Sequence, residues 1–268
     1  MFWVNGVESD LVARTDRSFQ YGDGCFTTIL MRDGKPEFWQ HHVERMDLSL
    51  NQLSIPSPNW TQVADWVRMA AMPESVAGIK IHISRGEGGR GYSPTQVHSP
   101  SVTISAFAFP DHYKVLRQQG MHLGVCRQRL GLNPMLAGLK HNNRLEQVLL
   151  KGEIDQQGLV DGVALDIEGY VVETTMANLF WRYADKWFTP ALDFAGVAGV
   201  MRRNVLDQLR AEQQCVEQGR YPLSHLEQSD EIFMTNAILG IAPVVSLGEI
   251  HYTAGNQTRR LQEHFKSC

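Results

Sequence analysis

Cysteine is scarce in this sequence, and the cysteines present form neither a metal-binding nor a disulfide pattern. No CxxC pair occurs, and the four residues lie far apart in the chain, at Cys25, Cys126, Cys215 and Cys268. The ten histidines show no HExxH or other ligand spacing. We therefore predict no metal site, no disulfide framework and four reduced, inert thiols.

Long apolar runs and an excess of one charge are also lacking. No uninterrupted apolar stretch reaches about 18 residues, and the start of the chain lacks the basic region and apolar stretch of an export signal. These absences predict a cytoplasmic protein without a membrane segment. A formal net charge of -4 provides no basic surface for nucleic acid, so any anion must be bound by local groups.

The composition that is present is typical of a globular protein. Hydrophobic residues make up 43% and charged residues 20% of the 268 residues, which is enough for one large or two modest domains. Strand and helix patterns alternate in both halves, so we predict an α/β (α+β) fold. We place a domain boundary near residue 115, between residues 1–115 and residues 116–268.

Hydrophobic periodicity predicts the order of the elements. In the first domain we expect strands at 3–6 (ending in a turn), 78–84 and 102–109, and helices at 43–53 and 61–72. In the second we expect a connector at 111–120, helices at 143–156 and 200–213, and strands at 121–127, 162–166, 170–173, 178–181, 187–189 and, last, 231–235. The apolar stripe of the helix at 143–156 consists of Leu145, Val148, Leu149 and Ile154, and Ser224 and Glu227 have capping-box spacing.

Lys140 is the first candidate for chemistry. It closes a loop that carries glycine and proline just before a predicted helix, where a lysine can be presented to a cavity, although most loop lysines face water. A free lysine with a pKa of ~10.4 is neutral in only about one molecule in 2,500 at pH 7. A lysine nucleophile therefore needs burial or condensation with an aldehyde such as pyridoxal phosphate.

Such a cofactor also needs an acid partner for its pyridine nitrogen and a clamp for its phosphate. Glu173 follows three apolar or aromatic residues in a predicted strand, so its carboxylate is a candidate for the first role. A glycine-bearing turn at 196–202 opens a predicted helix, where backbone N–H groups favour an anion, and Arg45 can donate charge-assisted hydrogen bonds. Each of these features alone is also typical of an ordinary strand edge, helix start or exposed side chain.

Together these segments resemble the aminotransferase-like, fold-type IV family of pyridoxal-phosphate enzymes over essentially the whole chain. Residues 16–26 resemble the family's DR..QYGDG.F block, and residues 42–45 resemble its H..R phosphate motif. The resemblance implies Lys140 as the lysine that binds pyridoxal 5'-phosphate and Glu173 as the partner of the pyridine nitrogen. It implies phosphate contacts from Arg45, Val200, Met201, Asn236 and Ala237, of which the last two depart from the usual family pair and are expected to use backbone groups.

Two segments favour a lyase branch of this family over its transaminases. Residues 143–148 and 84–92 resemble the lyase forms of these regions, and Leu145 stands where branched-chain aminotransferases usually carry a tyrosine. Residues 86–91 also match GxGxxG, but Tyr92, Ser93 and Pro94 follow instead of a helix, so a dinucleotide site is not predicted. The substrate contacts implied are Thr28, Arg85, Arg90 and Asn178.

The resemblance thus implies a lyase that converts 4-amino-4-deoxychorismate to 4-aminobenzoate and pyruvate in folate biosynthesis. It also implies a homodimer in the cytoplasm. One alternative is an amino-acid transaminase for D- or branched-chain substrates, which would use the same Lys140 and Glu173. A second alternative is a protein that binds the cofactor without catalysing a reaction.

Overall fold

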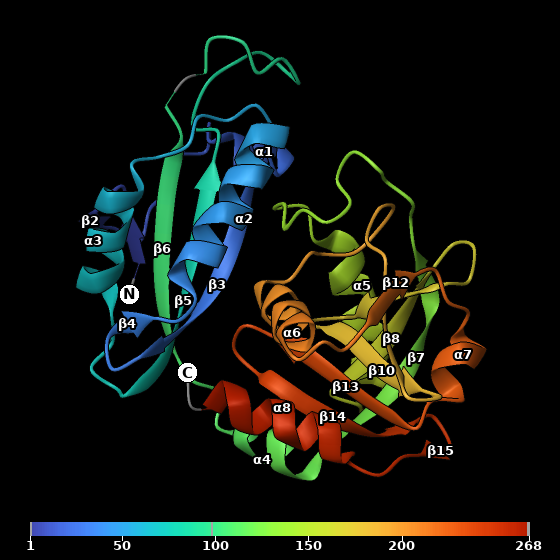
Figure 1. Cartoon of the computed structure of the whole chain (residues 1–268). Helices are drawn as coiled ribbons and strands as arrows, with labels where there is room; N and C mark the ends of the chain where they lie inside the picture. Colours follow the sequence, from blue (N-terminus) through green and yellow to red (C-terminus); the bar gives the residue numbers. More distant parts are fainter. Residues whose placement is uncertain (1, 98, 267–268) are drawn as a thin grey trace. The chain divides into compact units, whose positions relative to one another are not determined.

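The computed structural model describes residues 2–97 and 99–266 and divides the chain into two compact units (Figure 1). The first unit comprises Met1–Phe109 with Leu139–Asn143, and the second comprises Pro110–Gly138 with Arg144–Cys268. We expected a boundary near residue 115 and placed Lys140 in the second domain. In the structure the chain leaves the first unit after Phe109, and the short segment that carries Lys140 returns to pack with it.

The first unit is built on a six-stranded antiparallel sheet with the order β2-β1-β6-β5-β3-β4. Its strands are β1 (Phe2–Val4), β2 (Val7–Glu8), β3 (Gly24–Arg32), β4 (Lys35–Pro36), β5 (Val76–Ser84) and β6 (Ser101–Ala108). Its helices are α1 (Arg17–Tyr21), α2 (Trp39–Gln52) and α3 (Trp60–Ala70). The predicted strands and helices of this part are confirmed, and α1, β2, β3 and β4 were not predicted.

Two helices cover this sheet because their apolar residues recur at helical spacing. Helix α2 packs along β3 and α3 packs against β6 (Figure 1). Met46 and Leu50 of α2 share one buried core with Val63 and Val67 of α3 and the apolar residues of the sheet. The side chain of Asn59 accepts hydrogen bonds from two backbone N–H groups at the start of α3 and caps it.

The second unit contains a mixed nine-stranded sheet with the order β12-β11-β10-β13-β14-β7-β8-β9, and β15 pairs with β14. Its strands are β7 (Met121–Leu130), β8 (Asp161–Asp166), β9 (Val171–Thr174), β10 (Asn178–Tyr183), β11 (Lys186–Pro190), β12 (Val216–Gly219), β13 (Glu231–Asn236), β14 (Gly240–Leu247) and β15 (Ile250–His251). Its helices are α4 (His112–Gln119), α5 (Leu145–Gln156), α6 (Val200–Ala211), α7 (Leu223–Glu227) and α8 (Asn256–Lys266). Helices α4 and α8 pack on β14, α5 packs on β7 and α6 on β13.

Three expectations for this unit are wrong. Residues 111–120 are not a plain connector, because α4 forms there with a polar sequence that has no fully buried residue. The capping box at Ser224 and Glu227 does not form, since α7 starts after Pro222 and no side-chain cap is seen among the described residues. The strand at 231–235 is not the last, because β14, β15 and α8 follow it.

The apolar stripe expected on the helix at 143–156 is also wrong in part. Helix α5 begins at Leu145, and its buried residues are Leu150 and Ile154, which lie one turn apart on the face toward β7 and β8. Leu145, Val148 and Leu149 are 71%, 63% and 51% exposed, so they lie on the opposite side of the helix. The sequence pattern mixed residues from both faces.

The described cysteines are free thiols, of which Cys25 and Cys126 are buried and Cys215 is exposed. Burial raises the pKa of the two buried thiols to about 12, so they stay protonated at neutral pH. Cys268 lies outside the described residues. Within residues 2–97 and 99–266, no group of three histidine, cysteine or acidic residues could hold a metal ion, and no helix is long and apolar enough to cross a membrane.

Candidate functional site

Lys140 is held against the start of β3 by main-chain hydrogen bonds. The N–H of Phe26 donates to the carbonyl of Lys140 at 2.9 Å, and the N–H of Asn142 donates to the carbonyl of Gly24 at 3.0 Å. The Lys140 ammonium lies 4.6 Å from the centroid of the Phe26 ring, and the ammonium of Lys80 in β5 lies 4.4 Å from the same centroid. The backbone of the lysine is therefore fixed as an added strand segment.

The two asparagines that follow the lysine strengthen this attachment. The side-chain amide of Asn142 donates to the hydroxyl of Ser18 at 2.8 Å and to the carbonyl of Ile83 at 3.3 Å. The side-chain amide of Asn143 donates to the carbonyl of Gly22 at 3.1 Å. The side chains of Asn142 and Asn143 thus bind the lysine segment to other residues of the first unit.

Thr28 shares its face of the sheet with the ring that contacts the lysine. Residues two apart in a strand point to the same side, so Phe26 and Thr28 of β3 face one way and Thr27 faces the other. In the sheet register Thr28 lies opposite Lys80 of β5. Burial lowers the pKa of Lys80, which is half-buried beside the Phe26 ring. This face of the first unit therefore carries two amines, an aromatic ring and a hydroxyl group.

Arg45 of α2 contacts Thr27 of β3. Its guanidinium donates from Nη2 to the hydroxyl oxygen of Thr27 at 2.5 Å. The same hydroxyl lies 2.6 Å from Nδ1 of His42, which is one helical turn before Arg45. The predicted phosphate-binding arginine thus contacts Thr27, which in turn contacts His42, the first residue of the H..R motif.

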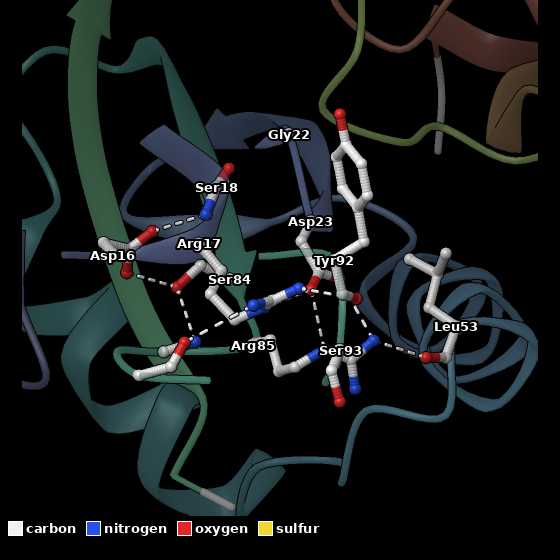
Figure 2. Close-up of polar contacts among 12 residues, drawn as sticks. Asp16, Arg17, Ser18, Gly22, Asp23, Leu53, Ser84, Arg85, Tyr92 and Ser93 are labelled. Atoms are coloured by element: carbon white, nitrogen blue, oxygen red, sulfur yellow. Dashed lines mark hydrogen bonds and ion pairs between the residues drawn. The ribbon is translucent and has the colours of Figure 1, made fainter. Parts of the chain in front are cut away.

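A partly buried carboxylate, that of Asp23 near the start of β3, binds two buried arginines (Figure 2). Asp23 accepts hydrogen bonds from Nε of Arg17 at 2.8 Å and from Nε and Nη2 of Arg85 at 2.7 and 3.0 Å. The side chains of the arginines are 3% and 8% exposed, and that of Asp23 is 13% exposed. Burial alone would raise the pKa of Asp23, but the hydrogen bonds and charges of Arg85 and Arg17 outweigh it and lower that pKa.

Arg17 also holds the glycine-rich loop that follows β5. Its Nη atoms donate to the carbonyls of Gly91 and Tyr92 at 3.1 and 3.2 Å, and Nη1 lies 3.4 Å from that of Gly88. Gly89 has a φ of +77°, and a Cβ there would lie 2.6 Å from the backbone carbonyl oxygen of Ser93, so this turn of the loop requires glycine.

Arg85 has a different environment from the one expected of a substrate-binding residue. Besides Asp23, its guanidinium donates to the carbonyls of Leu53 and Ser54 at 2.7 and 2.9 Å (Figure 2 shows the bond to Leu53). These groups bind the buried guanidinium, and the predicted contact of Arg85 with the substrate stays a prediction. Arg90 is exposed on the loop, and its predicted contact with the substrate also stays a prediction.

Glu173 is buried at the end of β9 in the second unit, with 5% of its surface exposed. Its Oε2 accepts hydrogen bonds from the N–H of Val197 at 2.9 Å and from the amide of Asn178 at 3.5 Å. Asn178 also donates to the carbonyl of Val197 at 2.8 Å and accepts from the N–H of Gly199 at 3.2 Å. Asn178 therefore holds the turn at 197–199 by two hydrogen bonds. Its predicted contact with the substrate stays a prediction.

That turn leads into the N-terminus of α6. Gly199 is the N-cap, and among the described residues no side chain caps the first turn, although Val200 and Met201 are both buried. Backbone N–H groups at such an end favour an anion such as phosphate. Between β13 and β14, the side-chain oxygen of Asn236 accepts hydrogen bonds from the N–H groups of Ile238 and Leu239. Because this side-chain oxygen is occupied, an anion at Asn236 and Ala237 would meet backbone groups.

The chain connects the lysine segment directly to this turn. Gly138 donates to the carbonyl of Gly196 at 3.0 Å and accepts from the N–H of Ala198 at 2.9 Å. A single residue, Leu139, separates Gly138 from Lys140. The segment that precedes the lysine is therefore paired with the residues on either side of Val197, which binds the Glu173 carboxylate.

Comparisons with known proteins identify the family of the chain. The family model of class IV amino-transferases matches residues 24–247. The chain belongs to the class IV amino-transferase family. It is 53% identical to an aminodeoxychorismate lyase of Vibrio harveyi over 98% of both chains.

Solved structures give the same picture for this class IV amino-transferase. The crystal structure of 4-amino-4-deoxychorismate lyase from Pseudomonas aeruginosa matches with a TM-score of 0.93 and 34% identity, covering 100% of this chain and 98% of that one. A branched-chain amino acid aminotransferase from Escherichia coli matches with a TM-score of 0.87 and 25% identity, covering 99% and 93%. The predicted family and fold class are confirmed.

Several polar residues of this class IV amino-transferase were missed by sequence reasoning. Asp23 and Arg17 belong to the block at 16–26 that carried the family resemblance, yet the sequence alone does not show that they meet Arg85. Asn142 lies two residues after Lys140, and His42 is the first residue of the H..R phosphate motif. Their positions in these blocks were the available signal, but a role follows only from their contacts.

Proposed function

We propose that this protein is a pyridoxal 5'-phosphate-dependent lyase that converts 4-amino-4-deoxychorismate to 4-aminobenzoate and pyruvate, a reaction of folate biosynthesis. The observation that carries the proposal is the similarity to the lyase of Vibrio harveyi, at 53% identity over nearly the whole of both chains. The geometry supports it because Lys140 and Glu173 have the attachments that such chemistry needs. Leu145, in place of the tyrosine expected in branched-chain aminotransferases, favours the lyase.

Each unit contains residues whose chemistry fits part of the cofactor. In the second unit, the buried Glu173 carboxylate suits a pyridinium nitrogen, and the uncapped N-terminus of α6 at Val200 and Met201 suits a phosphate, with backbone groups of Asn236 and Ala237. In the first unit, Lys140 supplies the amine and Arg45 a second phosphate ligand. When bound, pyridoxal phosphate supplies an electron sink for the carbon that loses a proton.

The chain's own residues then act on the substrate. The Lys140 amine removes the proton from C4 and delivers a proton to the methylene carbon of the departing enolpyruvyl group, which leaves as pyruvate. Aromatisation of the ring makes the reaction effectively irreversible. Thr28 offers a hydroxyl group on the face of β3 that also carries Phe26, and the exposed Arg90 offers a cation for a substrate carboxylate.

The homodimer and the cytoplasmic location stay predictions that rest on the family resemblance. Size-exclusion chromatography with light scattering checks the first: a mass near twice 30.2 kDa is expected, and a mass near 30.2 kDa would contradict it.

Substitution of the lysine tests the proposed function. Lys140→Ala is expected to abolish both the visible absorbance of the bound cofactor and the formation of pyruvate. Lys114→Ala is the matched control, because Lys114 is a surface lysine of α4 that pairs with Asp111 and whose side chain is 69% exposed. A Lys140→Ala protein that keeps its visible band and its turnover would exclude Lys140 as the cofactor lysine.

The same assay separates the transaminase alternative, which the likeness to the aminotransferase of Escherichia coli keeps in view. Stoichiometric transfer of an amino group to 2-oxoglutarate, with no pyruvate from aminodeoxychorismate, would favour the transaminase over the lyase.

A further inference from the structure

The hydroxyl group of Thr27 joins Arg45 to a buried histidine. Nη2 of Arg45 donates to Oγ1 of Thr27 at 2.5 Å, and Oγ1 lies 2.6 Å from Nδ1 of His42. Thr27 and His42 are each only 1% exposed. Water therefore does not compete for the bond between Thr27 and His42, and the buried hydroxyl group is satisfied by Arg45 and His42.

The number of donors determines the direction of each bond. A guanidinium can only donate, so the Thr27 oxygen accepts from Arg45. A threonine hydroxyl has one hydrogen, and within the described ranges the other partner of Thr27 is Nδ1 of His42. Pointing that hydrogen at Nδ1 gives it an acceptor and makes Nδ1 the unprotonated nitrogen of the ring, and this is the assignment that we adopt. The order of donation is Arg45 to Thr27 to His42.

This order requires a neutral histidine. Burial, followed by the charges of Arg45, His41 and Lys140, lowers the pKa of His42 well below its ordinary value of 6.5. The ring is thus neutral at physiological pH, and its Nδ1 is available as an acceptor. A charged ring would instead present a second donor to a hydroxyl that already accepts from Arg45.

We propose that Thr27 and His42 are positioning residues that hold the Arg45 guanidinium in the orientation in which it binds the phosphate of the cofactor. The proposal rests on the proposed function, because it needs a phosphate at Arg45. It assigns the histidine of the H..R motif a role through the arginine rather than a contact with the phosphate. Helix α2 presents both members of the motif, and β3 supplies the hydroxyl group between them.

We call the hydrogen bonds from Arg45 to Thr27 and from Thr27 to His42 the relay, and two pairs of variants test it. Thr27→Val keeps the shape of the side chain without the hydroxyl, and Thr27→Ser keeps the hydroxyl. His42→Leu removes the acceptor, whereas His42→Asn places a carbonyl oxygen at the position of Nδ1. We expect the dissociation constant of pyridoxal phosphate to rise roughly tenfold for Thr27→Val and His42→Leu and to stay near the wild-type value for Thr27→Ser and His42→Asn.

The position at which the relay acts is tested with pyridoxal, which lacks the phosphate. If the relay acts through Arg45 on the phosphate, Thr27→Val and His42→Leu change the affinity for pyridoxal by less than about twofold. His225→Leu is the matched control, because Nδ1 of His225 also accepts a hydrogen bond, from the indole of Trp181 at 3.0 Å, without any part in this relay. It is expected to leave the affinity for pyridoxal phosphate unchanged.

The outcomes separate this inference from the proposed function. Wild-type protein that does not bind pyridoxal phosphate would overturn both. If the wild-type protein binds pyridoxal phosphate and Thr27→Val and His42→Leu bind it with the same affinity as the wild type, the relay alone is overturned. The relay alone is also overturned if these two variants lose as much affinity for pyridoxal as for pyridoxal phosphate. If Thr27→Val does not fold, as judged by circular dichroism of the cofactor-free protein, the comparison of His42→Leu with His42→Asn decides.

Discussion

Replacing Asp23 by asparagine should destabilise the protein strongly, because it leaves two buried arginines without their carboxylate. The carboxylate accepts three hydrogen bonds from Arg17 and Arg85, whose side chains are 3% and 8% exposed. Removing one partner of a buried ion pair costs roughly 3–5 kcal/mol, since the remaining charge stays buried and uncompensated. The backbone carbonyls that also bind the arginines remain, so we expect a loss of about 3 kcal/mol, at the lower end of that range.

Denaturation in urea, followed by circular dichroism and tryptophan fluorescence, measures this loss. Trp3, Trp39, Trp60 and Trp66 pack around the core of the first unit and report on it. Asp65→Asn is the matched control, because Asp65 pairs with Arg68 on the surface of α3, where the side chains are 56% and 63% exposed. Such a pair contributes about 1 kcal/mol or less. If Asp23→Asn lowers the free energy of unfolding no more than Asp65→Asn does, the ion pairs of Asp23 with Arg17 and Arg85 do not stabilise the fold.

The pH dependence gives a second check on Asp23. Its pKa in the folded protein is lower than the ordinary value of 3.8, so its ionisation stabilises the folded state above pH 3.8. That contribution is lost as the pH falls through the lower, folded-state pKa. The difference in unfolding free energy between wild type and Asp23→Asn should therefore be constant near neutral pH and shrink below pH 3.8. A difference that grows on acidification would refute the reasoning.

Two further predictions concern the second unit. Gly152→Ala in α5 should raise the free energy of unfolding by roughly 0.5–1 kcal/mol, because an added Cβ meets no atom within 4 Å and alanine favours the helix; a lowered thermal midpoint would contradict it. Glu173→Gln should keep the acceptor for the N–H of Val197 but lose the negative charge, so we expect turnover to fall roughly 10²–10⁴-fold while the cofactor still binds. Unchanged turnover of Glu173→Gln would exclude its role at the pyridine nitrogen.

Sequence patterns predicted the elements whose apolar residues face one buried side. The helix at 61–72 and the strand at 78–84 are examples, because each packs one regular face into the core of the first unit. Helices α4 and α8 were missed since their sequences are predominantly polar. Strand β14 was missed because it is buried on both sides and shows no alternation.

The candidate site divides in the same way. Lys140, Glu173 and Arg45 could be singled out because their residue types and the surrounding blocks match a cofactor's needs. The hydrogen bonds of Arg85 and Asn178 could not be predicted, because both depend on partners distant in the sequence that only folding brings near them. Arg85 meets Asp23 across 62 positions, and Asn178 meets the N–H of Gly199 across 21.

The most direct test of the proposed function is the stoichiometry of the reaction with 4-amino-4-deoxychorismate. Purified protein loaded with pyridoxal phosphate is given the substrate, pyruvate is measured with a coupled dehydrogenase, and 4-aminobenzoate is measured by its fluorescence. We predict one pyruvate for each 4-aminobenzoate, with both absent in Lys140→Ala. A visible cofactor band without pyruvate from the wild-type protein would contradict the proposed lyase.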